Sequence, residues 1–155
     1  MATSWTNEWN DIIRYVIFPD PELKTLMMIP DRTTIITFID KYFLRTSTVS
    51  KPLVDEDVRI VYGNYGTGLA GAPKVLKQEI SFDIYVKDKH LHNIGTDRLV
   101  FRTEEIASRL IYLLTKTDPK LLGGYHFRCV GQSDMSTTTI GYVRYNVTFM
   151  YTRSV

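Results

Sequence analysis

The feature that most constrains the fold is a strict alternation of apolar and polar residues in the second half of the chain. Two segments follow it, 76–87 with Ile80, Phe82, Ile84 and Val86, and 138–152 with Val143, Tyr145, Val147, Phe149 and Tyr151. Successive side chains of a β-strand point to opposite faces, so the pattern predicts two strands that each bury one face. A strand over 138–152 is much longer than usual. We therefore expect it to reach past the domain body, to bend, or to pair with something besides its own neighbours.

The first 45 residues follow a helical period instead. Before Pro19, one apolar stripe at helical spacing contains Trp5, Trp9, Ile12, Ile13, Val16 and Ile17. Asp20 and Pro21 suit the N-cap and first turn of a second, short helix, which ends at Pro30. Residues 33–44 keep a helical spacing and predict a third helix, although their β-branched side chains lower its helix propensity.

The rest of the chain predicts a sheet with one long helix. In order, the patterns indicate a strand at 58–62, a glycine-rich hairpin loop at 63–73, a strand at 76–87, a polar loop, a helix capped by Thr103 and running to Thr115, a strand at 125–130, a polar turn at 131–134 and the strand at 138–152. Three helices followed by a β-β-α-β-β unit predict an α+β fold, with helices packed on a mainly antiparallel sheet. We expect a single domain, 1–155, with a helical part at 1–45 and a sheet part at 58–152.

Length and composition exclude several classes of protein. The longest clean apolar runs have about five residues, against the roughly 20 of a membrane-spanning helix, and the first residues lack the pattern of a signal peptide. A formal charge of +2 argues against a dedicated nucleic-acid binder. The one cysteine, Cys129, excludes an intramolecular disulfide and indicates a reducing interior. Its place on one strand face with Tyr125 and Phe127 predicts a buried, inert thiol.

Trp5 and Trp9 lie four residues apart on the apolar stripe of the first helix. Aromatic residues on such a stripe usually pack in the core. Tryptophan is also favoured at binding hot spots, so an exposed anchor for a partner is the alternative. We expect core packing, because polar residues occupy the opposite helical face.

Gly66-Thr67-Gly68-Leu69-Ala70-Gly71 is a literal G-x-G-x-x-G. In a dinucleotide site these glycines follow a strand and open a helix, whose N-terminal amides hold the pyrophosphate. Here Pro73 and an alternating strand follow, and Ala72 and Pro73 stand where a P-loop needs Lys and Ser or Thr. The segment therefore predicts a flexible hairpin loop and no nucleotide site.

Asp88, His90 and His92 raise the question of a zinc site. Two histidines two residues apart on a strand share a face, and a carboxylate could complete a three-ligand set. The only other histidine is His126, and no H-E-x-x-H or C-x-x-C accompanies it. We therefore expect His90 and His92 to be surface residues and not zinc ligands.

Gly131-Gln132-Ser133-Asp134-Met135 resembles the start of a nucleophile elbow. Met135 stands where the second glycine of that motif belongs, and a strand pattern follows instead of a helix. We expect a polar hairpin turn. Because this motif is rejected, the sequence predicts no catalytic residue, cofactor or metal site. We therefore expect the protein to act through contacts that its surfaces make with partners.

One resemblance is carried by residues 58–152. The strand Ile80-Ser81-Phe82-Asp83-Ile84-Tyr85-Val86, the loop end Asp97-Arg98-Leu99, the helix start at 104–110 and the closing run at 141–149 follow one another as strand, long loop, helix, hairpin and long strand. In this order and character the chain resembles the tail terminator proteins of tailed bacteriophages, also called tail completion or neck proteins.

The resemblance implies a structural virion protein without enzymatic activity or cofactor. Such proteins form a hexameric ring on the last ring of tail-tube protein, stop tube growth and present a surface to the head-completion or connector proteins. In a contractile tail the sheath is a further partner, and genomic DNA passes transiently through the lumen. The implied location is the neck of the virion, after assembly in the host cytoplasm, with no membrane involved.

The resemblance also implies where partners bind. The loop 63–73 and the turn 131–137 would face the axial partners, and the strand 138–152 would lie at the seam between subunits. Nine residues are candidates for partner contact: Asn64, Tyr65, Thr67, Leu69, His90, His92, Gln132, Asp134 and Met135.

Three alternatives stay open at this point. The first is another head-tail connector, head-completion or baseplate subunit with the same small fold. The second is a small enzyme that uses a nucleotide at the glycine segment or a metal at His90 and His92. The third is a bacterial housekeeping adaptor.

Overall fold

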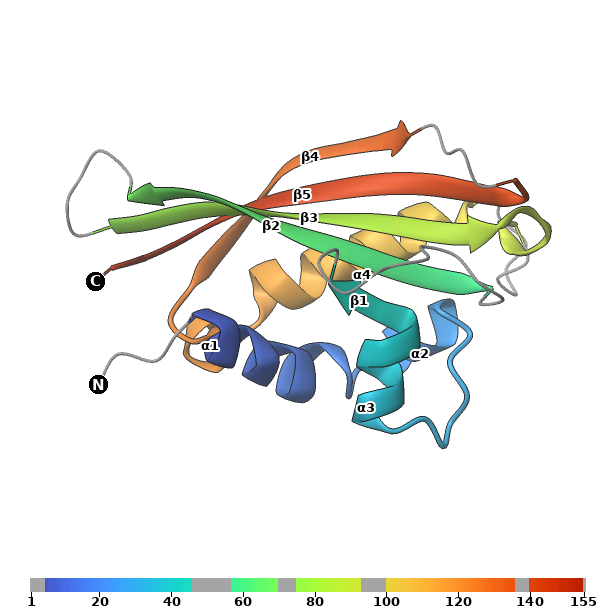
Figure 1. Ribbon diagram of the computed structural model, residues 1–155, viewed down its shortest axis with the longest axis horizontal. Coiled ribbons are helices and arrows are strands. Elements are labelled where there is room, and N and C mark those ends of the chain that lie inside the picture. Colours follow the sequence, from blue (N-terminus) through green and yellow to red (C-terminus); the bar gives the residue numbers. More distant parts are fainter. Residues whose placement is uncertain (1–4, 46–56, 70–74, 93–99, 136–139, 155) are drawn as a thin grey trace.

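A five-stranded sheet with three long central strands organises the molecule (Figure 1). In the computed structural model, residues 5–45, 57–69, 75–92, 100–135 and 140–154 are described. The strands lie in the order β1-β2-β3-β5-β4, and their bounds are β1 Phe43–Arg45, β2 Val58–Leu69, β3 Val75–Lys87, β4 His126–Met135 and β5 Tyr142–Ser154. Neighbouring strands are antiparallel except β1, which pairs parallel with β2.

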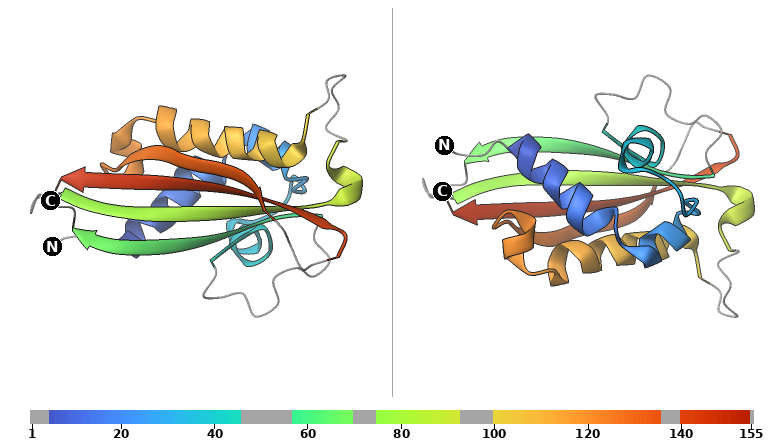
Figure 2. Two further views of the ribbon diagram at one scale, coloured as in Figure 1. Left: turned by 90° about the horizontal axis from the view of Figure 1, so that it is seen from above. Right: turned by 90° about the horizontal axis from the view of Figure 1, so that it is seen from below.

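The described α-helices lie on one side of this sheet (Figures 1 and 2). They are α1 Trp5–Ile12, α2 Pro21–Leu26, α3 Ile35–Thr37 and α4 Arg102–Lys116, with π-helical turns η1 Ile13–Ile17 and η2 Phe38–Tyr42 and 3₁₀ turns η4 Asp88–His90 and η5 Pro119–Leu122. The fold is therefore α+β, as the sequence predicts. In the part of the chain that the structure describes, no helix has both the length and the apolar character to cross a bilayer.

The predicted alternation accounts for the core. On β3, Ile80, Phe82, Ile84 and Val86 are fully buried toward the helices, and the intervening residues are partly exposed on the other face. β5 follows the same pattern, with Val147, Phe149 and Tyr151 fully buried. Residues of α1, α2, α4 and the sheet join in one hydrophobic cluster. One face of the sheet thus packs against the hydrophobic core, and the other face carries no described helix (Figure 2).

Trp9 packs in the core, as predicted. Its ring lies within 6.5 Å, centroid to centroid, of Phe43, Tyr62, Phe82 and Phe127, with a T-shaped arrangement at 5.6 Å against Tyr62. α1 therefore sits over the middle of the sheet through a cluster of aromatic rings from β1, β2, β3 and β4. The side chain of Trp5 lies outside the described set, so its predicted role is open.

Asp20 ties the second helix to α4. Its carboxylate accepts the backbone N–H of Leu23 at 2.9 Å as the N-cap of α2, as predicted, and accepts Nε and Nη2 of Arg109 at 2.9 and 2.6 Å. Burial by itself would raise the pKa of the Asp20 carboxyl, but the hydrogen bonds from Arg109 and Leu23 outweigh burial and lower that pKa below its ordinary value.

This arrangement predicts a loss of stability in acid. Because the pKa of Asp20 is lower in the folded than in the unfolded chain, its stabilising contribution is complete well above the ordinary carboxyl value of about 3.9 and is lost as the pH falls through the lowered value. Asp20→Asn keeps a capping side chain but loses the charge, so we expect about 1–2 kcal/mol of destabilisation at pH 7. In urea unfolding from pH 7 to pH 3, the variant should lose less stability than the parent chain. Parallel pH profiles of the two proteins would contradict this role.

The third helix is where the prediction is partly wrong. Residues 35–42 are helical, but the chain then leaves the helix, and Phe43–Arg45 form β1 beside Ile60–Tyr62 of β2. Phe43 is buried among aromatic rings and stacks on Phe38 at 5.5 Å. Long-range pairing and this aromatic packing thus decide the conformation of Phe43–Arg45, although none of the three is β-branched and Leu and Arg favour helices.

The glycine-rich hairpin loop predicted at 63–73 is also wrong in its first part. β2 continues through Leu69 and pairs with β3 as far as Leu76, with an irregular register between Gly66 and Leu69. Extension of an already formed antiparallel ladder outweighs the poor strand propensity of glycine, and glycine tolerates the irregular backbone there. Residues 70–74 lie outside the described residues.

Two further boundaries differ from the prediction. α4 begins at Arg102 with Phe101 at the cap position and no side-chain cap, while Thr103 is buried in the first turn. The polar turn predicted at 131–134 is strand: β4 runs to Met135, with a register shift between Cys129 and Gly131. A bulge lets the ladder with β5 continue past the glycine where the sequence indicates a turn.

The long last strand is an interior strand and no edge. β5 pairs with β3 over its whole length and with β4 from Arg144 to Thr152. Its 13 residues are matched by the 13 residues of β3, so its length needs no outside partner. The expectation that this strand lies at a subunit seam is therefore wrong, because both of its edges are occupied inside the chain.

Candidate functional site

The sheet face away from the helices carries an ordered band of polar side chains. Asn146 Nδ2 donates to Ser81 Oγ at 2.7 Å and to Asp83 Oδ1 at 3.0 Å, and Thr148 Oγ1 donates to Asn146 Oδ1 at 2.9 Å. Thr148 and Ser81 are themselves 3.0 Å apart at their hydroxyl oxygens. These cross-strand contacts fix the side chains of β3 and β5, so the band is a rigid polar surface.

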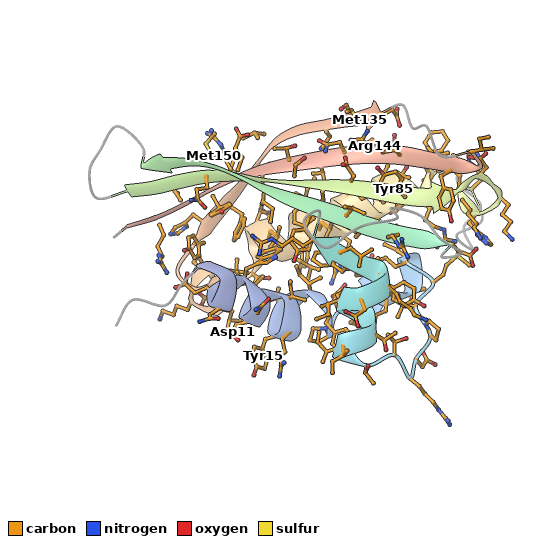
Figure 3. The ribbon with its side chains drawn as sticks, in the orientation of Figure 1. Asp11, Tyr15, Tyr85, Met135, Arg144 and Met150 are labelled. Atoms are coloured by element: carbon orange, nitrogen blue, oxygen red, sulfur yellow. The ribbon has the colours of Figure 1, made fainter. Side chains whose placement is uncertain are left out.

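Arg144 continues this band toward the beginning of β5. Its Nη2 donates to Asp83 Oδ2 at 3.0 Å, and its guanidinium lies 6.0 Å from the ring centre of Tyr85. Arg144, Met135 and Met150 lie on the side of the sheet away from the helices (Figure 3). Burial raises the pKa of the Tyr85 hydroxyl, and the charge of Arg144 opposes that rise. The band thus holds charge in paired form, which suits contact with a polar surface.

Three of the predicted contact residues lie on the last part of β4. Val130–Met135 are exposed at every position, which is unusual for a strand. Gln132 and Asp134 point to the helix side, where Gln132 Oε1 accepts the Tyr145 hydroxyl at 3.3 Å, and Met135 lies in register with Arg144 on the other side. Burial raises the pKa of Tyr145, and the nearby carboxylates of Glu104 and Asp134 raise it further. Asp134 and Glu104 thus place two carboxylates near Tyr145, while Arg144 lies beside Met135 on the other side of the sheet.

His90 and His92 lie near the same end of the sheet. η4 follows β3, and the Asp88 N–H donates to the Gly141 carbonyl at 2.9 Å, so this turn lies beside the start of β5. His90 Nε2 is 3.4 Å from Asp57 Oδ1, while the His92 ring packs on Phe101 at 4.9 Å. The two imidazoles thus contact different neighbours. Among the described residues, no group of three or more His, Cys, Asp or Glu side chains could hold a metal ion.

Asn64, Tyr65, Thr67 and Leu69 lie on the second half of β2, which runs to the end of the sheet opposite the end of β4 (Figure 1). The strand register places Tyr65 beside Glu79 and Asn64 beside Ile80. Only the backbone of these four residues is described. The nine predicted contact residues are therefore spread along the long strands. Asn64 lies level with Cys129 and Gln132 lies level with Tyr62, both near the middle, while Leu69 lies toward one end and His90 and His92 follow the other end.

Two surface hollows were not predicted from the sequence. One of about 400 Å³ lies on the open sheet face against His126, Arg128, Met150 and Thr152. The strand pattern 126–128 could have indicated it, since its polar members share a face.

The other hollow, of about 300 Å³, lies beside α1 and η5, and Tyr15 and Leu121 are exposed there. Figure 3 shows Asp11 and Tyr15 directed away from the sheet. Tyr15 lies off the apolar stripe of the first helix, and this position could have indicated an exposed aromatic residue beside the hollow. Leu121 had no such signal.

Cys129 lies on the predicted strand face, but the prediction of a buried thiol is only partly correct, because the side chain is partly exposed. It follows Phe127 on the helix-facing side of β4, partly buried against the core, and its Sγ is 3.7 Å from the Gly131 carbonyl oxygen. This position suits a packing role.

No protein-family model matches the chain, and no curated protein sequence matches it.

Proposed function

We propose that this chain is a structural subunit of the neck of a tailed bacteriophage, a tail terminator that caps the tail tube and joins the tail to the head-completion proteins. The observation that carries the proposal is that the predicted contact residues reach from Leu69, toward one end of the long strands, to His90 and His92 beyond the other end. The strands β2, β3 and β5, of 12 to 13 residues, run along the longest dimension of the molecule (Figure 1). A capping subunit needs two such separated ends.

The two ends differ in chemistry as a terminator requires. One end carries the last, glycine-containing part of β2 with Thr67 and Leu69, and the other carries η4 with His90, followed by His92. A ring of such subunits has two unlike faces. One face can match the tail tube, and the other does not repeat the growth surface of the tube, so polymerisation stops by mismatch.

The polar band on the open sheet face supports a role in binding. Its hydrogen bonds fix Ser81, Asp83, Asn146 and Thr148 before any partner arrives, so little side-chain entropy is lost on contact. Under this proposal the partners are other copies of the chain, tail-tube protein, head-completion protein and, in a contractile tail, sheath. The subunit assembles in the host cytoplasm and ends in the virion neck.

A phage that does not produce this chain tests the proposal. We expect a phage lacking it to produce overlong tails without heads, because tube growth continues and no surface recruits the head. Electron microscopy of lysates measures tail length and attachment, and supply of the intact chain in trans should restore normal particles. Tails of normal length joined to heads would contradict the proposal. Empty or unfilled heads with normal free tails would favour the head-completion alternative.

Substitutions at the two ends sharpen this experiment. Tyr65→Ala and His92→Ala, supplied in trans, should fold like the parent chain, and each should weaken binding to one axial partner and leave the other intact. Binding of each purified variant to tail-tube protein and to head-completion protein measures this. Arg32→Ala, in the exposed connection between α2 and α3, is the control with no expected effect. If Tyr65→Ala and His92→Ala weaken the same partner equally, the two ends do not serve different partners.

A further inference from the structure

The two outer edges of the sheet are both open in the described part of the chain. β4 pairs on one side only, with β5, and β1 pairs on one side only, with β2. Sheet edges usually carry Lys, Pro or a bulge that prevents further pairing. In Val130–Met135 there is no Lys or Pro, and Val130 and Met135 are 42% and 41% exposed. The bulge between Cys129 and Gly131 falls on Val130, the first residue of this stretch, and Asp134 is the one charged residue of the stretch.

The directions of the two edge strands are compatible with pairing between copies. β1 is parallel to β2, and each further step across β3, β5 and β4 is antiparallel, so β1 and β4 run in opposite directions. Two copies placed side by side in the same orientation therefore bring β4 of one copy against β1 of the next as an antiparallel pair. No rotation within the plane of the sheet is needed.

The open stretches of β1 and β4 also lie at the same height along the strand direction. One row of the register contains Arg45, Tyr62, Phe82, Val147 and Gln132, and a second row contains Phe43, Ile60, Ile84, Tyr145 and Asp134. A copy placed beside the first without a shift along the strands sets Gln132 opposite Arg45 and Asp134 opposite Phe43. The three residues of β1 therefore meet the exposed part of β4 and not its beginning.

One charge pair and one hollow favour contact between the two edges, and Asp40 also lines that hollow. Arg45 is exposed at the end of β1, and it shares the helix side of the sheet with Gln132 and Asp134. Diagonal neighbours on paired strands are about 7–8 Å apart, within reach of an arginine side chain, so Arg45 can meet Asp134. A hollow of about 320 Å³ also lies beside β1, lined in part by Ile39, Leu44 and Arg45. It offers room for side chains of an added strand.

We propose that a second copy of this chain adds the end of its β4, Val130–Met135, to the β1 edge of the first copy, with Asp134 of one copy beside Arg45 of the next. This seam rests on the proposed function, for which it supplies the contact between subunits of the ring. The two surfaces are different, so each copy uses one and offers the other, and the array closes into a ring if the rotation per copy permits. The sheet then continues from subunit to subunit through backbone hydrogen bonds.

A charge exchange in the full-length chain tests the seam. Asp134→Lys and Arg45→Glu each place like charges together, and each should weaken self-association about tenfold or more. The double variant restores opposite charges and should return within about threefold of the parent chain. Sedimentation velocity and native mass spectrometry measure self-association, and circular dichroism confirms the fold. Asp31→Lys and Arg32→Glu, the same charge changes at exposed positions between α2 and α3, are the matched controls.

A cross-link gives a second, independent result. Gln132→Cys and Arg45→Cys are each made in a Cys129→Ser background, since directly opposite residues on paired strands can form a disulfide. Oxidation of an equimolar mixture should join the two variants, and neither variant alone should form the same dimer in comparable yield. Charge reversals that act like the controls, or a mixture that gives no cross-link, would overturn the seam. A chain that stays monomeric at all concentrations and forms no cross-link would also overturn it.

The seam and the proposed function can fail separately. Cross-linked rings from a chain whose loss leaves tails normal would retain the seam and refute the terminator role. Overlong tails on loss of the chain, together with unaffected assembly of the charge variants, would retain the role and refute the seam. If Asp134→Lys abolishes binding to tail-tube protein but not self-association, the end of β4 binds that partner and the proposal is wrong.

Discussion

Val147→Lys should leave no stably folded chain. Val147 is fully buried on the helix-facing side of β5, in the register row with Phe82 and Tyr62. A buried ammonium group without a partner costs several kcal/mol, and deprotonation of the lysine to avoid this still leaves an oversized polar side chain in a packed core. Domains of this size are commonly stable by about 5–15 kcal/mol, and a loss well above about 4 kcal/mol removes most or all of the stability of a domain at the lower end of that range.

Circular dichroism, size-exclusion chromatography and urea unfolding measure the effect. The matched control is Met150→Lys, three residues later on the same strand but on the open, partly exposed face, in register with Glu79. We expect it to change stability by less than about 1 kcal/mol. An unfolded Met150→Lys beside a folded Val147→Lys would mean that the faces of β5 are reversed.

The second large effect is expected for Trp9→Ala, at about 3–5 kcal/mol of destabilisation. The indole is 3% exposed and is surrounded by the rings of Phe43, Tyr62, Phe82 and Phe127. Its removal leaves a cavity between α1 and the sheet, which a rigid sheet cannot close. Loss of the ring also weakens the docking of α1, because this residue lies at the centre of the contact.

Urea unfolding followed by circular dichroism measures this change. Tyr15→Ala provides the comparison, because Tyr15 is 70% exposed on the next turns of the same helical segment and should cost less than about 0.5 kcal/mol. Equal effects at the two positions would show that α1 does not depend on its buried face. A Trp9→Ala chain of parent stability that fails to bind a partner would favour the anchor role considered from the sequence.

The long strands and the main helices could be predicted because the spacing of apolar and polar residues within each segment is enough to identify it. Ile80, Phe82 and Ile84 alternate with polar residues and face the core, and the stripe containing Trp9, Ile12 and Ile13 does so at helical spacing. Each pattern follows from one element that buries one face. The α+β class follows from the order of these elements.

β1 could not be predicted, because its cause is distant in the sequence. Phe43–Arg45 are strand only because Ile60–Tyr62 lie beside them, and local spacing continues the preceding helix. Gly66 and Gly131 also led to wrong predictions, for the same reason. Local propensity indicates a turn at each, while a ladder with a partner strand carries the chain onward.

The candidate site shows the same limit. The sequence identified exposed polar positions such as Gln132 and Asp134. It could not indicate that Asp134 lies level with the β1 strand, because that relation depends on the register of four strand pairs. Residue types can suggest a surface, but only the assembled sheet relates one edge to the other.

The interior place of β5 determines when this chain can fold during its synthesis. β5 is the last described strand to leave the ribosome, yet it lies between β3 and β4 and supplies Val147, Phe149 and Tyr151 to the core. Until it emerges, β4 lacks its partner and the inner edge of β3 is open. Translation must therefore run almost to Ser154 before the sheet closes, and during that interval unpaired strands are open to contact with other nascent chains. A chain that lacks β5 is therefore expected to aggregate, because β3 and β4 then have unpaired edges.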